Sequence, residues 1–290
     1  MRSLPDPALA NANFRADLHC HTTCSDGSLD PKQIIDLAIE VGLNALAITD
    51  HDTVDAYKIA LPYAQEKQFL LGTGVEFSCE FKKESVHVLG YDFFLDSELF
   101  LEYCSRQQEK RLHRNREILE KLQKRHMNVE EKDLLALHHK ASTIGRPHIA
   151  AVMVLKGYVK SIQEAFQLYL GDHKSCFVPG VPFPVSEAIE VIHKAGGKAF
   201  VAHPHLYNNA NLIRDVLQLP FDGIECHYGR SPPEKTKRWQ KLARHKGLLI
   251  SGGSDFHGEA KPHIQLGSSW VNEEVFDSIF QSVARPQKTQ

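Results

Sequence analysis

Histidines and carboxylates that follow short apolar runs are the residues of this chain best suited to chemistry. His19 and His21 stand two residues apart in the run Asp17-Leu18-His19-Cys20-His21-Thr22, so on a β-strand both imidazoles project from one face. Two imidazoles placed in this way can hold one metal ion. Further acids and histidines occupy comparable positions along the chain: Asp26, His51, Glu76, His87, His203, Asp255 and His257.

The joint placement of these side chains predicts a metal centre with more than one ion. Side chains that follow separate parallel strands converge, because the carboxyl ends of such strands meet in one crevice. Burying so many polar groups together without a metal would leave many hydrogen bonds unmade. Imidazoles and carboxylates without thiolates suit Mn²⁺, Fe²⁺ or Zn²⁺. The six cysteines are interpreted as reduced, packed thiols, with Cys24 the one that could add a ligand.

Short apolar runs alternate with helical patterns over most of the chain, which predicts an α/β fold with a mainly parallel sheet. A helix is expected to begin at Asp30-Pro31, an N-cap followed by a first-turn proline, and another to stop before Gly196-Gly197. Continuously apolar strands are typical of a sheet covered on both faces. The expected strands include residues 45–49, 70–75, 198–202, 221–224 and 248–254.

The middle of the chain breaks this alternation. Residues 99–180 contain no convincing strand and read as a helical insertion between two parts of one β/α domain, residues 14–98 and 181–290. Within the insertion, residues 105–125 carry eight lysines and arginines against three glutamates, a local charge of +5. Most basic helix faces are simply solvated, so the charges alone leave open whether this helix faces an anion.

Overall charge and hydropathy exclude several classes of function. The chain has 34 Lys and Arg against 36 Asp and Glu, a net charge of −2, which argues against bulk binding to long duplex nucleic acid or to a membrane surface. No apolar run approaches the ~18 residues of a membrane span. Pro5, Asp6 and Pro7 interrupt the region where a signal peptide would need an apolar core. We therefore expect a cytoplasmic protein.

The motifs together resemble those of the PHP (polymerase and histidinol phosphatase) phosphoesterases. The similarity follows the chain in order, from about Arg15 to Gly258. It implies a distorted (β/α)7 barrel with a helical insertion and three divalent metal ions in its mouth, and among the suitable metals it favours Mn²⁺. The motifs that carry the resemblance are His19-x-His21, Asp26-Gly27, Thr49-Asp50-His51-Asp52, Gly74-x-Glu76, Ala202-His203-Pro204 and Ser254-Asp255-x-His257.

The resemblance also implies which residues hold each ion. The first ion would be held by His19, His21, Glu76 and Asp255, and the second by Asp26, His51 and His257, of which Asp26 and His257 are also the expected catalytic residues. The third would be held by Glu76, acting as a bridge, with His87 and His203. Asp17, Asp50 and Asp52 are candidates to orient the imidazoles as hydrogen-bond acceptors. Asp52 is equally a candidate N-cap for a helix after Thr53.

Chemistry and substrate follow from this arrangement. Divalent ions would lower the pKa of a bridging water toward ~7, and the resulting hydroxide would attack phosphorus in line. The insertion resembles the PHP subgroup that contains ribonuclease AM (TrpH-like) and the 3′,5′-nucleoside bisphosphate phosphatases. That resemblance implies hydrolysis of the 3′-side phosphoester of a nucleoside 3′,5′-bisphosphate or a short 5′-phosphorylated single-stranded RNA. The expected substrate-binding residues are Arg111, Arg114, Arg146 and His148.

Other functions stay open at this point. A histidinol-phosphatase-like phosphomonoesterase would leave Arg111, Arg114 and Arg146 without a role. A metal-dependent amidohydrolase fits the ligand types but not the basic insertion. A non-catalytic metal-binding module is disfavoured because the ligand set is nearly complete. Glu225 and His227 follow another predicted strand, and their residue types do not separate substrate contact from packing.

Overall fold

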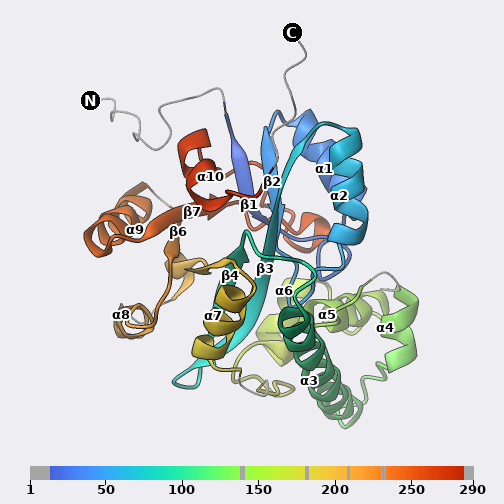
Figure 1. The fold of residues 1–290 in the computed structure, drawn as a ribbon. Coiled ribbons are helices and arrows are strands. Elements are labelled where there is room, and N and C mark those ends of the chain that lie inside the picture. The colour runs from blue at the N-terminus through green and yellow to red at the C-terminus, as the bar shows by residue number, and fades with distance from the viewer. Residues whose placement is uncertain are drawn as a thin grey trace, which may run out of the picture.

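The computed structural model describes residues 14–137, 141–179, 183–207, 210–229, 231 and 233–283. Seven strands form one sheet in chain order. Its first strand lies beside the last and is bridged through Cys20 to Phe256, just beyond that strand, which nearly closes a barrel (Figure 1). The strands are β1 (Ala16–Cys20), β2 (Ala45–Ile48), β3 (Leu70–Phe81), β4 (Glu84–Tyr91), β5 (Lys198–Val201), β6 (Gly223–Tyr228) and β7 (Leu249–Gly253).

The expected α/β barrel is confirmed, with one strand reversed. β1, β2 and β3 are parallel, as are β5, β6 and β7, whereas β4 is antiparallel to both of its neighbours. The reversal follows from the tight turn between β3 and β4, in which Lys82 and Lys83 have φ values of 52° and 68°. Two consecutive residues with positive φ give a turn whose twist matches that of a hairpin.

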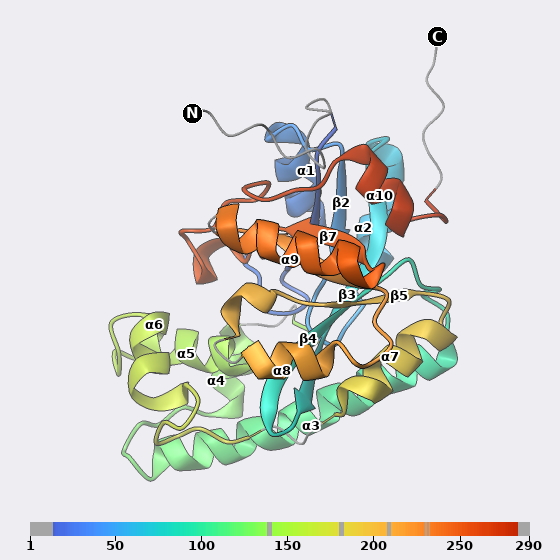
Figure 2. The same cartoon turned by 90° about the vertical axis from the view of Figure 1, so that its left-hand side faces the viewer.

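Helices cover the outside of the barrel (Figures 1 and 2). α1 begins as expected, because the Asp30 carboxylate accepts hydrogen bonds from the amides of Lys32 and Gln33 and Pro31 occupies the first turn. α7 ends before Gly196, whose φ of 81° favours glycine. The covering helices are α1 (Pro31–Glu40), α2 (Tyr57–Glu66), α7 (Val185–Lys194), α8 (Ala210–Val216), α9 (Pro233–Lys246) and α10 (Glu273–Ile279), with short turns η3 (Pro204–Leu206) and η4 (Gly258–Ala260).

Between β4 and α7 the described residues contain helices and no strand. α3 packs Phe100 and Tyr103 into the barrel core, while its second half joins a separate apolar cluster that includes Leu122 and Met153. Figure 1 shows this helical segment projecting from one side of the barrel. The division at residues 99 and 181 stays a prediction, and residue 181 lies outside the described residues. The segment contains α3 (Glu98–Gln123), α4 (Glu131–Leu137), α5 (Arg146–Leu155), α6 (Ile162–Ala165) and the π-helical η2 (Phe166–Leu170).

A buried tyrosine ties helix α2 to the strands that carry the site. The Tyr57 hydroxyl accepts a hydrogen bond from the amide of Gly74 (2.7 Å) and donates to the carbonyl of Ile48 (2.7 Å). These two residues lie just before Glu76 and His51. Among the described helices, none is long and apolar enough to cross a membrane.

Candidate metal centre and anion pocket

The structure brings all nine predicted metal-site residues to one end of the barrel. Apart from His203, these residues form three groups, and within each group the ligand atoms all lie within 4.8 Å of one another. Glu76 joins two of these groups, and His203 contacts it as well, with 2.8 Å between His203 Nε2 and Glu76 Oε1. The groups are His19, His21, Glu76 and Asp255; then His21, Asp26, His51 and His257; and then His51, Glu76 and His87.

The surroundings of Glu76 fit bound cations. Its Oε2 lies 3.2–3.3 Å from ring nitrogens of His19, His21 and His51, and its Oε1 lies 2.7 Å from His87. Burial raises the pKa of Glu76, but the neighbouring imidazoles lower it well below its ordinary value overall, so the carboxylate is ionised. Within the described part of the chain, both ring nitrogens of His21 and Nδ1 of His203 are buried without a hydrogen-bond partner. Imidazole nitrogens left unpaired around a carboxylate are the donor set that a transition metal binds.

Glu225 forms hydrogen bonds to two residues of this cluster. Its side chain is fully buried, and its Oε1 lies 2.8 Å from Nδ1 of His19. Its Oε2 accepts a hydrogen bond from the amide of His203 at 2.6 Å. Glu225 therefore orients one predicted ligand through its ring and another through its backbone, in the manner of the carboxylates that fix metal-binding histidines. His227 points elsewhere, with its Nε2 3.2 Å from Gln240 Nε2.

Tyr228 and Lys261 hold the outer oxygen of Asp255. The Tyr228 hydroxyl lies 2.9 Å and the Lys261 ammonium 2.8 Å from Asp255 Oδ2, while Oδ1 faces His19 and His21 at 3.4–3.5 Å. Burial lowers the pKa of Lys261, but Asp255 raises it above its ordinary value overall, so the ammonium is charged. The reasoning from sequence missed both residues. The position of Tyr228 at the end of a strand could have indicated a role at the cluster, whereas nothing in the sequence around Lys261 indicates one.

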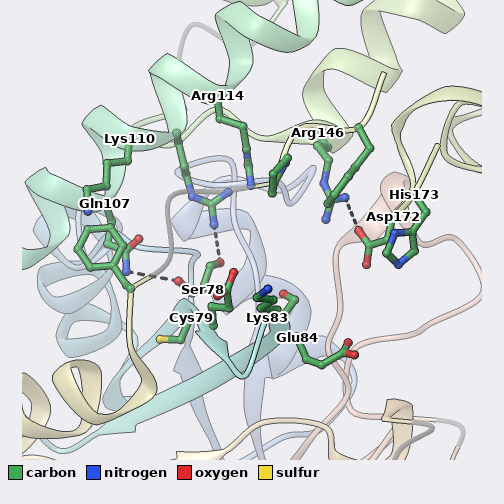
Figure 3. A pocket seen from close by; sticks show the side chains of 16 residues that line it. Ser78, Cys79, Lys83, Glu84, Gln107, Lys110, Arg114, Arg146, Asp172 and His173 are labelled. Carbon is green, nitrogen blue, oxygen red and sulfur yellow. Dashed lines mark hydrogen bonds and ion pairs between the residues drawn. The ribbon is translucent and has the colours of Figure 1, made fainter. Parts of the chain in front are cut away.

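A pocket of about 390 Å³ lies between helix α3, the start of α5 and the β3–β4 hairpin (Figure 3). Of its three guanidinium groups, two form ion pairs with carboxylates of the described residues. Arg111 pairs with Asp52, with 2.6 Å between Nε and Oδ2, and Arg146 pairs with Asp172 at 2.8 Å. Among the described residues Arg114 pairs with no carboxylate, and its buried Nε has no hydrogen-bond partner. Burial and the nearby charges of Arg111 and Arg146 lower the pKa of Arg114, so its positive charge is poorly compensated where it lies.

Comparison with known proteins decides the family. The PHP domain matches residues 17–177. The 5′-3′ exoribonuclease Rnm of Salmonella typhimurium is 32% identical and aligns with 98% of this chain and 99% of its own length. The chain belongs to the PHP family.

Two other relatives are similar over nearly the same span. The 3′,5′-nucleoside bisphosphate phosphatase of Chromobacterium violaceum is 29% identical, covering 87% of this chain and 90% of that protein. A Bifidobacterium adolescentis protein, described as a metal-dependent phosphoesterase, superposes with a TM-score of 0.83 at 27% identity, covering 91% of this chain and 94% of that one. The protein is thus a metal-dependent phosphoesterase of the PHP type, with a cluster of histidines and carboxylates able to bind metal.

Three aspartates of this PHP phosphoesterase do not orient imidazoles, so that expectation is wrong. Asp17 accepts hydrogen bonds from the backbone amides of Ser254 (2.9 Å) and Gly267 (2.8 Å), and so joins β1 to β7 and the loop beyond. Asp50 accepts from the hydroxyls of Thr22 and Ser25, both at 2.6 Å. These carboxylates fix the loops that carry the cluster, and do not contact its rings.

Asp52 also departs from both of its expected roles. Its φ of 54° excludes the extended conformation of an N-cap, and α2 begins only at Tyr57. Its carboxylate instead accepts a hydrogen bond from the amide of Ser78 (2.9 Å) and pairs with Arg111. Since Asp52 directly follows His51, the ion pair connects the insertion helix to the cluster.

His148 joins two segments of the chain through its ring, and its expected role in phosphate binding stays a prediction. Its Nδ1 accepts a hydrogen bond from the amide of Gly145 (2.9 Å), and its Nε2 donates to the carbonyl of Ser25 (2.8 Å). Both ring nitrogens are therefore engaged by backbone atoms, and the ring joins the start of α5 to the loop that carries Asp26. Cys24, in the same loop, is buried and belongs to none of the ligand groups found among the described residues.

Proposed function

We propose that this PHP phosphoesterase cleaves the phosphoester on the 3′ side of a nucleotide that bears a 5′-phosphate. The substrates would be nucleoside 3′,5′-bisphosphates or the 5′ ends of short single-stranded RNA, and each cleavage would release a nucleoside 5′-monophosphate. The observation that carries the proposal is the unpaired Arg114 guanidinium in a pocket that the Arg111–Asp52 pair connects to the cluster. The names of the exoribonuclease and bisphosphate phosphatase relatives support the same substrate class.

Three divalent ions, with Mn²⁺ favoured over Fe²⁺ or Zn²⁺, fit the donor groups. The first ion would be held by His19, His21, Glu76 and Asp255, the second by Asp26, His51 and His257, and the third by Glu76, His87 and His203. When bound, the ions lower the pKa of a coordinated water and offset negative charge on the phosphate oxygens. Thiolates take no part in these groups, which accords with a hard, oxygen-rich substrate.

The chain's own residues then divide the work. Arg114 and Arg146 bind the 5′-phosphate, because both guanidinium groups line the pocket and a phosphate accepts charged N–H donors strongly. Arg111 has a positioning role, because its ion pair with Asp52 fixes the residue next to His51. At the cluster, Asp26 Oδ1 lies 3.4 Å from His257 Nε2, and we assign this pair to orienting a water for in-line attack on phosphorus. The phosphoester bond breaks on the side of the 3′-oxygen, which leaves as the hydroxyl of the 5′-nucleotide once it gains a proton.

A panel of substrates tests this assignment. With Mn²⁺ present, adenosine 3′,5′-bisphosphate should yield phosphate and the 5′-monophosphate, and a short 5′-phosphorylated RNA should yield 5′-mononucleotides. Histidinol phosphate should be a poor substrate. Faster turnover of histidinol phosphate would favour a small phosphomonoesterase, and no turnover of any substrate despite bound metal would favour a non-catalytic module.

The pocket has a matched pair of variants on one helix. Arg114→Ala should raise the KM for the bisphosphate by ~10- to 150-fold, the equivalent of losing a hydrogen bond to a charged group worth ~1.5–3 kcal/mol. Metal content should stay unchanged. Arg116→Ala is the control, because Arg116 lies two residues away, is 63% exposed and pairs with Glu131. Equal effects of the two variants on KM would remove the pocket from the proposal.

A further inference from the structure

Helix α9 presents a strongly basic face that the site does not use. Its 14 residues carry six lysines and arginines and a single glutamate, a net charge of +5 in a chain of net charge −2. The helix packs Trp239 and Ala243 against the barrel, where both are buried. We define the basic face of α9 as its exposed cations Lys237, Arg238, Lys241 and Arg244.

The basic face has no internal counter-charge. In the described part of the chain, none of its four cations lies within 4.0 Å of a carboxylate oxygen, whereas on α3 Arg106 pairs with Glu187. Lys237 and Lys241 are four residues apart, a spacing at which like charges destabilise a helix. The basic face therefore does not stabilise the helix, and its charge is complementary to that of an external polyanion.

Ring contacts connect this helix to the metal centre. Trp239 of α9 meets His205 edge-on at 6.1 Å, and His205 stacks on Tyr228 at 5.6 Å. The Tyr228 hydroxyl in turn donates to Asp255 of the cluster. The arginine pocket reaches the cluster from another element, through Asp52, and Figure 1 shows α9 and the insertion on opposite sides of the barrel. The cluster is thus reached from the pocket through Asp52 and from α9 through Tyr228 and His205. Figure 2 shows α9 lying across the face turned to the viewer.

We propose that the basic face of α9 binds the phosphate backbone of single-stranded RNA on the 3′ side of the scissile phosphate. This inference rests on the proposed function, in which the pocket holds the 5′-terminal nucleotide and the rest of the strand leaves the cluster on the other side. Lys237, Lys241 and Arg244 span about 10 Å of helix at 1.5 Å per residue, enough to face several backbone phosphates. A mononucleotide ends at the cluster and gains nothing from this face. The substrate class that the face selects is a polynucleotide.

The test compares two substrates at varied salt. In the triple variant Lys237→Gln, Lys241→Gln, Arg244→Gln, kcat/KM should fall at least tenfold at low salt for a 5′-phosphorylated oligoadenylate of about 15 nucleotides. For a single strand the slope of log(kcat/KM) against log[salt] is about −0.7 per phosphate contact, so losing three contacts makes it shallower by about 2. The kcat/KM for adenosine 3′,5′-bisphosphate should not change.

A second triple variant removes three exposed cations elsewhere. Lys32→Gln, Lys67→Gln, Lys194→Gln changes the net charge equally on α1, just beyond α2 and on α7, and should leave the salt slope as in the wild type. Equal slopes for the α9 variant and the wild type would overturn the inference, as would an equal effect of the two triple variants.

A binding measurement separates this inference from the proposed function. The anisotropy of a 3′-fluorescein oligoadenylate, titrated with protein in EDTA, reports RNA binding without turnover. Weaker binding by the α9 variant alone supports the basic face even if neither substrate is hydrolysed, a result that would refute the proposed function only. Unchanged binding by the α9 variant refutes the basic face, whatever the turnover of the bisphosphate.

Discussion

Replacing Glu225 by glutamine tests how far one buried carboxylate sets the metal affinity of the cluster. The two Glu225 oxygens accept from different donors, the ring of His19 (2.8 Å) and the backbone amide of His203 (2.6 Å). A glutamine has one oxygen and one NH₂ group, so one of these donors must face another donor. The substitution keeps the volume of the side chain, and the change is therefore confined to charge and hydrogen bonding.

Two estimates of the free-energy cost of Glu225→Gln agree, one from the lost hydrogen bond and one from the lowered metal affinity. A hydrogen bond to a charged group contributes ~1.5–3 kcal/mol, and its partner here is fully buried. Substituting a residue that orients a metal-binding histidine typically lowers metal affinity ~10- to 100-fold, which is ~1.4–2.7 kcal/mol. We therefore expect a 10- to 100-fold rise in the Kd of the tightest-bound divalent ion and a loss of ~1.5–3 kcal/mol in the unfolding free energy of the metal-free protein.

Competition with a chelating indicator gives the Kd, and urea denaturation in EDTA gives the stability. Asp222→Asn is the control outside the cluster, because Asp222 also accepts from a histidine ring, His193 Nε2, and from the backbone amide of Ala199, both at 2.7 Å. Both donors bond Asp222 Oδ2, and the side chain is partly exposed. This control should lose some stability and keep its metal affinity. If Glu225→Gln lowered stability with an unchanged Kd, Glu225 would be a packing residue and the reasoning would be wrong.

Three further outcomes are expected. Lys261→Met should lower metal occupancy measured by mass spectrometry after dialysis, because Asp255 Oδ2 loses a charged donor at 2.8 Å; full occupancy would contradict this. Tyr57→Phe should lower the unfolding free energy by ~1–3 kcal/mol, because the buried amide of Gly74 loses its acceptor, and an unchanged urea midpoint would show that water replaces it. His148→Ala should increase proteolytic cleavage of the insertion in the native protein, since its ring joins α5 to Ser25, whereas an unchanged cleavage rate would mean that other contacts suffice.

The residues of the metal centre were predictable because their positions follow from a local rule. Apart from His87, these residues lie at the carboxyl ends of predicted strands or in the loops beyond them, and parallel strands bring those ends together whatever the details of packing. His87 lies inside β4, which is antiparallel to both neighbours, so the rule does not account for its position. A local rule also accounts for the start of α1, where Asp30 and Pro31 act within one turn of helix. The reversal of β4 had no such local signal, because the turn residues Lys82 and Lys83 are not the glycine or asparagine that mark a hairpin.

The supporting residues were less accessible because they act across long distances in the sequence. Glu225 lies 206 residues from His19, and Tyr228 lies 27 residues from Asp255. Their residue types are ordinary at the end of a strand, so nothing local distinguishes an orienting carboxylate from a packed one. Only the closure of the barrel, which sets β6 beside β7 and β7 beside β1, makes these contacts.

Arg111 and Arg114 show where a local pattern stops being sufficient. Their spacing of three residues places both guanidinium groups on one face of α3, as the sequence indicates. It does not say which of them is free for an anion, because that depends on Asp52, which comes from a loop 59 residues away from Arg111. The ion pairs of the fold answer this question. Asp52 neutralises Arg111 and Asp172 neutralises Arg146, so Arg114 retains the charge that a phosphate would balance. A basic helix face is thus predictable from sequence, whereas its division into docking and binding residues requires the counter-charges that only the fold supplies.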